Sequence, residues 1–223
     1  MLSLDSHYKT LYVYREETKS HRIDATFHQT GKRLFDVCFS LLVTIFILSW
    51  LIPVIGLLII LGSKGPILYI QKRTGLRGSS FNCLKFRTMT YKPETEFKQT
   101  AKNDNRVTPL GRFLRKTNLD EMPQFLNVLL GDMSIVGPRP HALQHSAQFW
   151  NSMPEYRKRY RVKPGITGLA QVRGCRGETD QLMKMQHRVK YDRFYNRKKS
   201  AGLDLWICWL TVKAMMQGNV NAW

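Results

Sequence analysis

Acidic residues are scarce in this sequence. Its 223 residues contain 16 aspartates and glutamates against 35 lysines and arginines, so the formal net charge is +19 at pH 7. An excess of this size predicts an anionic partner, the main classes being nucleic acid, anionic lipid and phosphorylated small molecules. A pair of carboxylates placed among so many cations therefore needs an explanation of its own.

Cysteine pairs with metal-binding spacing are absent as well. The four cysteines, Cys38, Cys83, Cys175 and Cys208, are widely separated, and the six histidines form no ligand pattern with them. This arrangement argues against a zinc site and is typical of reduced thiols in a protein that faces the cytosol.

A secretory signal peptide is also lacking, because residues 1–31 are too polar to hold the apolar run that such a signal needs near its start. We interpret this stretch as a lead-in that is disordered or loosely docked. The chain is long enough for one domain with a real core. We therefore expect three parts: the lead-in over 1–31, a membrane helix over 32–62, and a cytosolic domain over 63–223.

Charged residues disappear between Val37 and Gly62. This run of 26 residues is rich in leucine, isoleucine, valine and phenylalanine, and about 20 apolar residues are enough for a helix to cross a bilayer. Buried helices of soluble proteins are rarely so long and so uniformly apolar. The run is therefore predicted to be a membrane helix.

Two arrangements of that helix stay open. Pro53 interrupts the run shortly after Ser49, and a proline removes one helical hydrogen bond while clashing with the previous turn. Basic residues flank both ends, so the positive-inside rule makes neither end external. A re-entrant helix that breaks near Ser49–Pro53 and returns to the cytoplasmic face satisfies both observations. A kinked single crossing is the alternative.

The remaining sequence changes to a soluble pattern. Two short strands are predicted at 67–70 and 81–89, followed by a polar loop at 91–106. Helical spacing predicts helices over 109–116, from Asp120 to about 130, over 141–163 and over 178–199. The apolar stretch Leu203–Met216 contains two tryptophans, which predicts an interfacial helix, with core packing as the alternative. The fold class is thus α/β, mostly helical with a small sheet.

Asp120 and Glu121 are neighbouring carboxylates between blocks of positive charge. Asp120 is a candidate N-cap or first-turn residue, where Pro123 is tolerated and free backbone N–H groups favour an ionised carboxylate. An acidic helix cap is the ordinary interpretation. The alternative is an ionised aspartate that attacks phosphorus, in which case arginines and a divalent cation would offset the developing charge.

Several cations have the spacing of a phosphate site. Alternation places Lys85 and Arg87 on one face of the second strand, and Arg112 and Arg115 lie one helical turn apart. Arg139 stands between two prolines, which hold the backbone extended and fix the direction of the guanidinium. For the Lys85 and Arg87 pair, a solvated basic face is the plain alternative.

Four stretches of the sequence together resemble one family of bacterial enzymes. From residue 32 onward they read, in order, KRLFDVCFSLL, GPILYIQKRTGLRGSSFNCLKFRTM, RVTPLGRFLRKTNLDEMPQFLNVLLGDMSIVGPRPH and VKPGITGLAQVRG. They are similar to the polyprenyl-phosphate sugar-1-phosphate transferases, the monotopic phosphoglycosyl transferases that start exopolysaccharide, capsule and O-antigen assembly. The later RGETD, at residues 176–180, resembles the branch that transfers hexoses such as glucose or galactose.

The resemblance implies a two-step reaction on the cytoplasmic face of a bacterial inner membrane. The residue corresponding to Asp120 attacks the β-phosphate of a UDP-sugar and releases UMP, and undecaprenyl phosphate then takes the phosphosugar. Glu121 would assist, and Mg²⁺ is expected at Asp120 and Glu121. The resemblance further implies a re-entrant helix broken at a Ser–Pro kink, contacts with membrane lipids, and an oligomeric state that leaves a homodimer open. The substrate-binding residues that it implies are Lys85, Arg87, Arg112, Arg115, Arg139, Gln171 and Arg173.

A non-catalytic function is the competing hypothesis. A basic membrane module that binds anionic lipid or nucleic acid would carry the same charge. No nucleic acid is expected, however, because the basic residues follow no recognition motif and a membrane segment precedes them. Such a module would gain affinity on neutralisation of Asp120 and Glu121, whereas a transferase would lose its function.

Overall fold

Helices make up most of the fold and two small sheets complete it, which confirms the predicted fold class. The structure is a computed structural model, and it describes residues 24–91, 104–175, 177 and 182–217. Most of the predicted lead-in, most of the predicted loop at 91–106, and most of RGETD therefore lie outside the described residues. The elements are α2 (Asp24–Val43), η1 (Thr44–Leu48), α3 (Ser49–Gly62), β1 (Leu68–Thr74), η2 (Leu76–Gly78), β2 (Ser80–Phe86), α4 (Pro109–Thr117), η3 (Leu119–Glu121), α5 (Gln124–Leu130), β3 (Ser134–Val136), α6 (Leu143–Trp150), η4 (Pro154–Arg161), β4 (Gly165–Thr167), α7 (Leu169–Val172), α8 (Leu182–Lys198) and α9 (Ala201–Met216).

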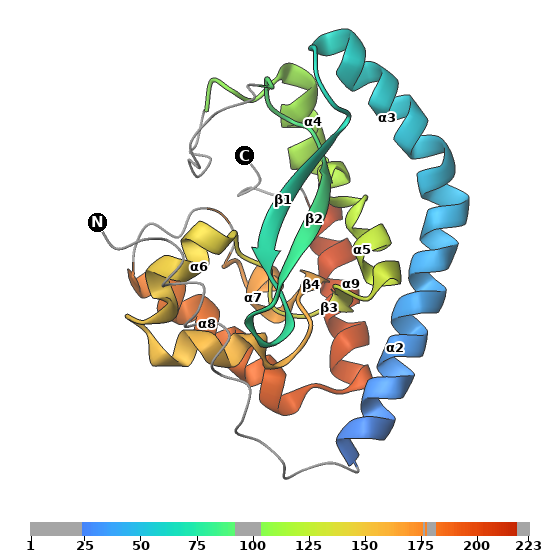
Figure 1. Cartoon of the computed structure of the whole chain (residues 1–223). Coiled ribbons are helices and arrows are strands. Elements are labelled where there is room, and N and C mark those ends of the chain that lie inside the picture. The colour runs from blue at the N-terminus through green and yellow to red at the C-terminus, as the bar shows by residue number, and fades with distance from the viewer. Residues whose placement is uncertain (1–23, 92–103, 176, 178–181, 218–223) are drawn as a thin grey trace.

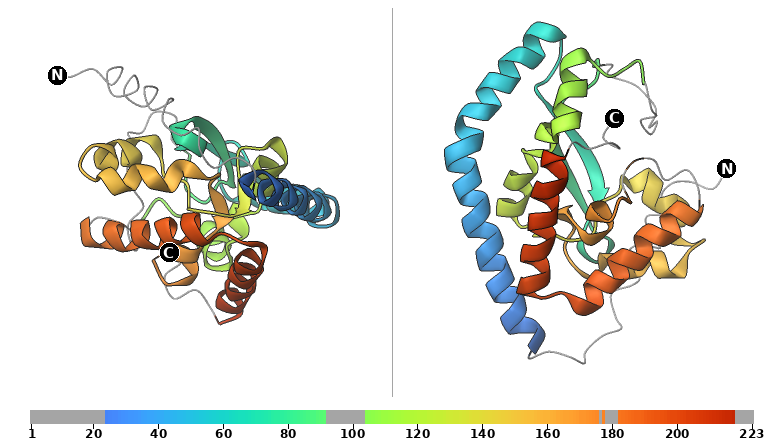
Figure 2. Two further views of the ribbon diagram at one scale, coloured as in Figure 1. Left: turned by 90° about the horizontal axis from the view of Figure 1, so that it is seen from below. Right: turned by 180° about the vertical axis from the view of Figure 1, so that it is seen from behind.

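The apolar run forms one long helix along one side of the molecule (Figures 1 and 2). α2, η1 and α3 follow one another without a gap, and α2 begins at Asp24, within the stretch predicted as a lead-in. Between Thr30 and Gly62 the helix is 33 residues long and apolar enough to cross a membrane. The prediction of a membrane helix is therefore consistent with both its length and its composition.

The predicted break at Ser49–Pro53 is absent, because the backbone stays helical through it. Five residues immediately before it, Thr44–Leu48, form a wider π-helical turn instead. Ser49 Oγ donates to the Ile45 carbonyl at 2.6 Å, and Trp50 Nε1 donates to the Phe46 carbonyl at 2.9 Å. A widened turn and side-chain donors can accommodate a proline within a continuous helix. The helix curves where a break was expected (Figure 1).

One face of this long helix is buried against the domain and the other is exposed. The buried side chains pack with Phe86 of β2 and Leu114 of α4; they are Val43, Leu48, Leu51, Ile55 and Ile59. The opposite face carries large apolar side chains in contact with solvent, among them Leu34, Leu42, Phe46, Leu57 and Leu61. The helix is thus held to the domain along its length while it presents an apolar surface outward.

Polar contacts fasten the first half of the helix. Asp36 is buried and its Oδ1 accepts from the backbone N–H of Ile135 at 3.0 Å. Lys32 pairs with Asp204 of α9 at 2.6 Å. Arg33 donates to the Val128 carbonyl, at the end of α5, at 2.6 Å. These contacts join the helix to three elements that lie far along the chain.

The predicted pair of short strands is present as the antiparallel hairpin β1–β2, in which Leu68 faces Phe86 and Thr74 faces Ser80. β3 and β4 form a second, parallel pair. These two strands meet through glycines, since a Cβ on Gly165 would lie 2.1 Å from the Gly137 nitrogen. This close approach fixes the start of the loop that carries Arg139.

α6, η4 and α8 lie on the side of the molecule opposite the long helix (Figures 1 and 2). The single helix predicted over 141–163 is wrong, because α6 ends at Trp150 and a separate 3₁₀ helix begins at Pro154. A proline restricts the preceding residue to extended conformations, and Met153 has φ −136° and ψ 93°.

α9 shows the features of both alternatives considered for it. Ile207 on one face is fully buried in the core, whereas Trp209 on the other face is 57% exposed. The helix therefore supports the core and also presents an apolar surface.

The Asp36 contact predicts a difference between two neighbouring buried positions. Asp36→Ala should lower the free energy of unfolding by about 1–3 kcal/mol, because it leaves the buried Ile135 N–H without an acceptor. Ser40→Ala is the matched control one turn away, since Ser40 Oγ is buried and makes no hydrogen bond within the described part of the chain. Denaturation in detergent micelles measures both, and equal losses would contradict the assignment.

Candidate active site

The carboxylate pair lies in a short 3₁₀ turn between two helices. α4 ends at Thr117, and Asn118 adopts the left-handed conformation, with φ 57°. Asparagine reaches that conformation more readily than most residues. The chain then turns into η3, and α5 starts at Gln124 with Pro123 as the residue before its first turn. This reversal turns Asp120 and Glu121 toward β2.

Asp120 is not the N-cap of α5 but lies in the first turn of η3, so the N-cap alternative is wrong and the first-turn alternative holds. It is only 8% exposed, and it makes no side-chain hydrogen bond to the residues that the structure describes. Burial raises the pKa of Asp120 to about 6, although Lys85, Arg115 and Arg139 oppose that rise. The expected stabilisation of its ionised form by a helix N-terminus is also wrong, since the cost of removing the carboxylate from water outweighs the nearby charges.

Glu121 has the opposite environment. Lys85 Nζ lies 2.6 Å from its Oε1, and Arg139 donates to both of its oxygens, with Nη1 3.0 Å from Oε2. Burial alone would raise the pKa of Glu121, but the charges and hydrogen bonds of Arg139 and Lys85 hold it well below the usual range. Neighbouring carboxylates thus have pKa values shifted in opposite directions, an arrangement that is frequent in active sites.

Arg115 contributes a third cation to the site. Its Nε donates to Thr88 Oγ1 at 2.9 Å, and its charge acts to lower the pKa of Asp120. α4 can approach Thr88 this closely because a glycine packs there: a Cβ on Gly111 would lie 2.0 Å from the Thr88 carbonyl oxygen. The structure therefore brings Lys85, Arg115 and Arg139 around the carboxylate pair, as the sequence predicted.

Arg87 is held in a different place. Its guanidinium donates to carbonyls at the end of the long helix, to Ser63 at 2.7 Å and also to Lys64. The prediction that Lys85 and Arg87 share one face of the second strand is wrong, because β2 ends at Phe86 and Arg87 lies beyond it. Arg87 stabilises a helix end, a role typical of arginine near unpaired carbonyls.

The other predicted substrate-binding residues lie on α4 and at α7. Arg112 is exposed on α4. Gln171 is buried in α7 and donates to the Ile166 carbonyl at 3.1 Å. Arg173 follows α7 and stacks over the Trp206 ring at 5.1 Å. Their contacts with a substrate stay predictions.

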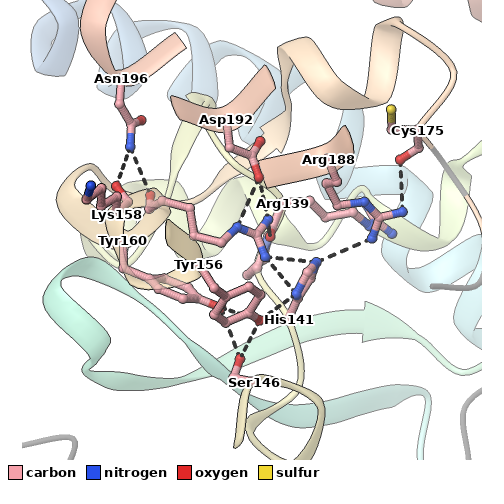
Figure 3. Close-up of polar contacts among 12 residues, drawn as sticks. Arg139, His141, Ser146, Tyr156, Lys158, Tyr160, Cys175, Arg188, Asp192 and Asn196 are labelled. Carbon is pink, nitrogen blue, oxygen red and sulfur yellow. Dashed lines mark hydrogen bonds and ion pairs between the residues drawn. The ribbon is translucent and has the colours of Figure 1, made fainter. Parts of the chain in front are cut away.

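Sequence reasoning missed a buried polar cluster behind Arg139 (Figure 3). Its members are Arg139, His141, Ser146, Tyr156, Arg159, Tyr160, Arg188 and Asp192. Arg159 belongs to the basic run at residues 157–163, yet it is fully buried. The available signal was the pair of tyrosines, three residues before Arg159 and one after it, which is unusual in a solvated basic segment.

The site suits a metal only in part. Among the described residues, no three aspartate, glutamate, histidine or cysteine side chains converge. Mg²⁺ commonly binds one or two carboxylates and takes its other ligands from phosphates and water. Asp120 fits that requirement, whereas the oxygens of Glu121 already face Lys85 and Arg139.

Comparison with known proteins identifies the class that this fold and site define. The family model for bacterial sugar transferases matches residues 27–218. This chain belongs to that family.

Three relatives are named for their activity or pathway. A Klebsiella pneumoniae UDP-glucose:undecaprenyl-phosphate glucose-1-phosphate transferase is 50% identical over 85% of this chain and 40% of its own length. A Caulobacter vibrioides protein of the same name is 44% identical over 83% of this chain and 69% of its own length. An exopolysaccharide production protein of Rhizobium leguminosarum is 43% identical over 81% of this chain and 92% of its own length. The chain thus spans about two fifths of the first relative.

The raised pKa predicts that Asp120 destabilises the fold when it is ionised. Its pKa in the folded protein, about 6, lies above the ordinary 3.8, so stability falls as the pH rises through 6. Asp120→Asn should therefore be more stable than the unchanged protein at pH 8, by up to about 3 kcal/mol, and the gain should shrink between pH 6 and 4.

Glu121→Gln is the control that should change stability in the opposite direction, because Lys85 and Arg139 lower the pKa of Glu121. It should lower stability at pH 8. Thermal unfolding in detergent at pH 5 and pH 8 distinguishes the two variants, and a destabilised Asp120→Asn at pH 8 would contradict the argument.

Proposed function

We propose that this chain transfers a hexose 1-phosphate, with glucose as the first candidate, from a UDP-sugar to undecaprenyl phosphate. The observation that carries the proposal is a buried aspartate that makes no side-chain hydrogen bond within the described part of the chain, is acted on by three cations, and has neighbours that pack on the apolar cluster of the long helix. The names of the relatives support the choice of donor and acceptor. The name of the Rhizobium relative supports a place in exopolysaccharide synthesis.

In the proposed first step, a carboxylate oxygen of Asp120 attacks the β-phosphorus of the UDP-sugar. The bond from that phosphorus to the bridging oxygen breaks, UMP leaves with the bridging oxygen, and the phosphosugar stays on Asp120 as an acyl phosphate. Lys85, Arg115 and Arg139 offset the charge that develops on the phosphate oxygens. A carboxylate with few hydrogen bonds to lose is well suited to act as the nucleophile.

In the second step, an oxygen of undecaprenyl phosphate attacks the same phosphorus, and the bond to Asp120 breaks. The lipid product leaves and Asp120 regains its carboxylate. The acceptor has to arrive from the bilayer, and the structure supports such a route. Leu119 and Met122, on either side of the carboxylate pair, pack against the apolar cluster that the buried face of the long helix forms with Phe86 and Leu114. The nucleophile is therefore flanked by residues that pack on the same cluster as the element that is predicted to enter the membrane.

The packing of the long helix favours immersion from the cytoplasmic face. A helix that crosses the bilayer is surrounded by lipid or by other membrane segments over about 30 Å. Here one face is covered by the domain from Asp36 to Ile59, and the domain also carries the charged site. We propose that only the outward face enters the lipid, with the exposed face of α9 at the interface. This arrangement corresponds to the re-entrant alternative in topology, although the helix has no break.

Mg²⁺ is the proposed cofactor. Asp120 would hold it together with oxygens of the diphosphate, and the ion would supply further positive charge where the phosphates are negative. Glu121 would act mainly by keeping Lys85 and Arg139 in place, because both of its oxygens are engaged with them. The partners proposed are thus the UDP-sugar, undecaprenyl phosphate and membrane lipids. A homodimer stays a prediction.

The first prediction of this function concerns product release. Purified protein in detergent with Mg²⁺ and UDP-glucose should release UMP, and undecaprenyl phosphate should make the release catalytic. Asp120→Asn should lower the rate at least about 10³-fold, because it removes the nucleophile. Asp132→Asn, which alters a half-buried carboxylate outside the site, is the matched control and should keep activity. Turnover by Asp120→Asn at the normal rate would refute the assignment.

The second prediction concerns pH. Asp120 attacks only when ionised, and its pKa is about 6, so kcat/KM should fall tenfold for each pH unit below about 6 and level off above it. A kcat/KM that begins to fall only near pH 4 would mean that the attacking group is a carboxylate with an ordinary pKa. Initial rates of UMP release between pH 4.5 and 8.5, at saturating undecaprenyl phosphate, measure this dependence of kcat/KM on pH.

A further inference from the structure

Arg159 is a buried guanidinium with contacts to three different partners. It lies in η4 and is fully buried. Its Nη2 lies 2.8 Å from Asp192 Oδ2 in α8, and its Nη1 lies 2.6 Å from His141 Nδ1. Nη2 also donates to the backbone carbonyl of Arg139 at 2.9 Å. One planar side chain thus joins two helical elements to the loop that carries a cation of the active site.

The surroundings of Arg159 keep it in one orientation. Tyr156 and Tyr160 place their rings 5.2 and 5.4 Å from its guanidinium carbon. Burial and the nearby arginines hold the pKa of His141 well below the usual range, so the ring is neutral and can accept a hydrogen bond. Asp192 supplies the compensating negative charge. A buried arginine held by an acid, two aromatic rings and a neutral histidine has little freedom to move.

The Arg139 loop is fixed at several points along its backbone. Arg73 Nη1 donates to the Pro140 carbonyl at 2.9 Å, and the Thr74 N–H donates to the His141 carbonyl at 2.9 Å. The bond from Arg159 holds the carbonyl of Arg139 itself. The Arg139 side chain then points to Glu121 and, through it, to Lys85.

We propose that Arg159 is a positioning residue for the reaction, which acts by holding the Arg139 backbone so that the Arg139 guanidinium faces the β-phosphate subsite beside Asp120. The inference rests on the proposed function, because it assigns to Arg139 the binding of a phosphate. Arg159 itself does not touch the substrate. Its geometry matters because small displacements of a group that binds the reacting phosphate can lower the rate about 100-fold.

Arg159→Lys is the variant that tests this role. Lysine keeps the positive charge beside Asp192 but lacks the fork that reaches Asp192, His141 and the Arg139 carbonyl together. Arg157→Lys is the matched control in the same 3₁₀ helix, where Arg157 donates outward to the Trp150 carbonyl and to Asn151. Arg159→Lys should lower kcat/KM for UDP-glucose by about 10- to 100-fold, and Arg157→Lys should leave it unchanged.

A double-mutant cycle separates positioning from general support of the fold. If Arg159 acts through Arg139, adding Arg159→Lys to Arg139→Lys should lower kcat/KM by no more than about twofold beyond Arg139→Lys alone. Losses that multiply would overturn the proposal. A merely structural role would instead lower the amount of folded protein, and the losses of the two variants would then multiply.

A second readout does not depend on catalysis. Inorganic pyrophosphate should bind the unchanged protein, as measured by calorimetry in detergent, and Arg159→Lys should weaken that binding to the same extent as Arg139→Lys. Pyrophosphate binding unaffected by Arg159→Lys would overturn the proposal. If the unchanged protein binds pyrophosphate but releases no UMP, the proposed function fails while the positioning role is still tested. If Arg159→Lys does not fold, Asp192→Asn, which removes the counter-charge of Arg159, enters the same cycle with the same expected result.

Discussion

The salt bridges of Glu121 with Lys85 and Arg139 are the interaction on which the site depends. They hold two cations beside Asp120, which is buried and has no hydrogen bond of its own among the described residues. Without that pairing, the basic side chains would repel one another in a space with little water. With it, Glu121 offsets the charge of the cations and stays ionised. Asp120 has a pKa of about 6 and therefore changes its ionisation close to neutral pH.

The fold brings these groups together from four separate parts of the chain. β2 supplies Lys85, α4 supplies Arg115, η3 supplies the carboxylates, and the loop after β3 supplies Arg139. The first three place Phe86, Leu114 and Leu119 in or against the apolar cluster that includes the buried face of the long helix. The long helix therefore has two roles, since one face organises the charged site and the other presents apolar side chains outward. The Arg139 loop is held instead from behind, by β1 and by the buried cluster around Arg159.

Several features were predictable from the sequence because they depend on local chemistry. The apolar run, the hairpin strands and the helix at Pro109–Thr117 all appear close to the predicted positions. Three of the predicted phosphate-site cations surround the carboxylates. The wrong predictions concern residues whose conformation depends on contacts with other parts of the structure. The helix continues through Pro53, with a π-turn and two side-chain donors just before it, and the Arg87 guanidinium donates to a carbonyl at the end of α3.

The sequence by itself determined that a membrane-associated basic domain carries a carboxylate pair in a cationic setting, since charge, hydropathy and family motifs are properties of the chain. Only the tertiary structure decided what each charge does. Desolvation depends on burial, so the same two residues, adjacent in sequence, acquire pKa values on opposite sides of their usual ranges. Burial likewise makes Arg159 an internal hydrogen-bond donor to the Arg139 carbonyl, although it lies in a basic run of the sequence. Such assignments depend on which side chains meet in space, and segments distant in sequence decide that.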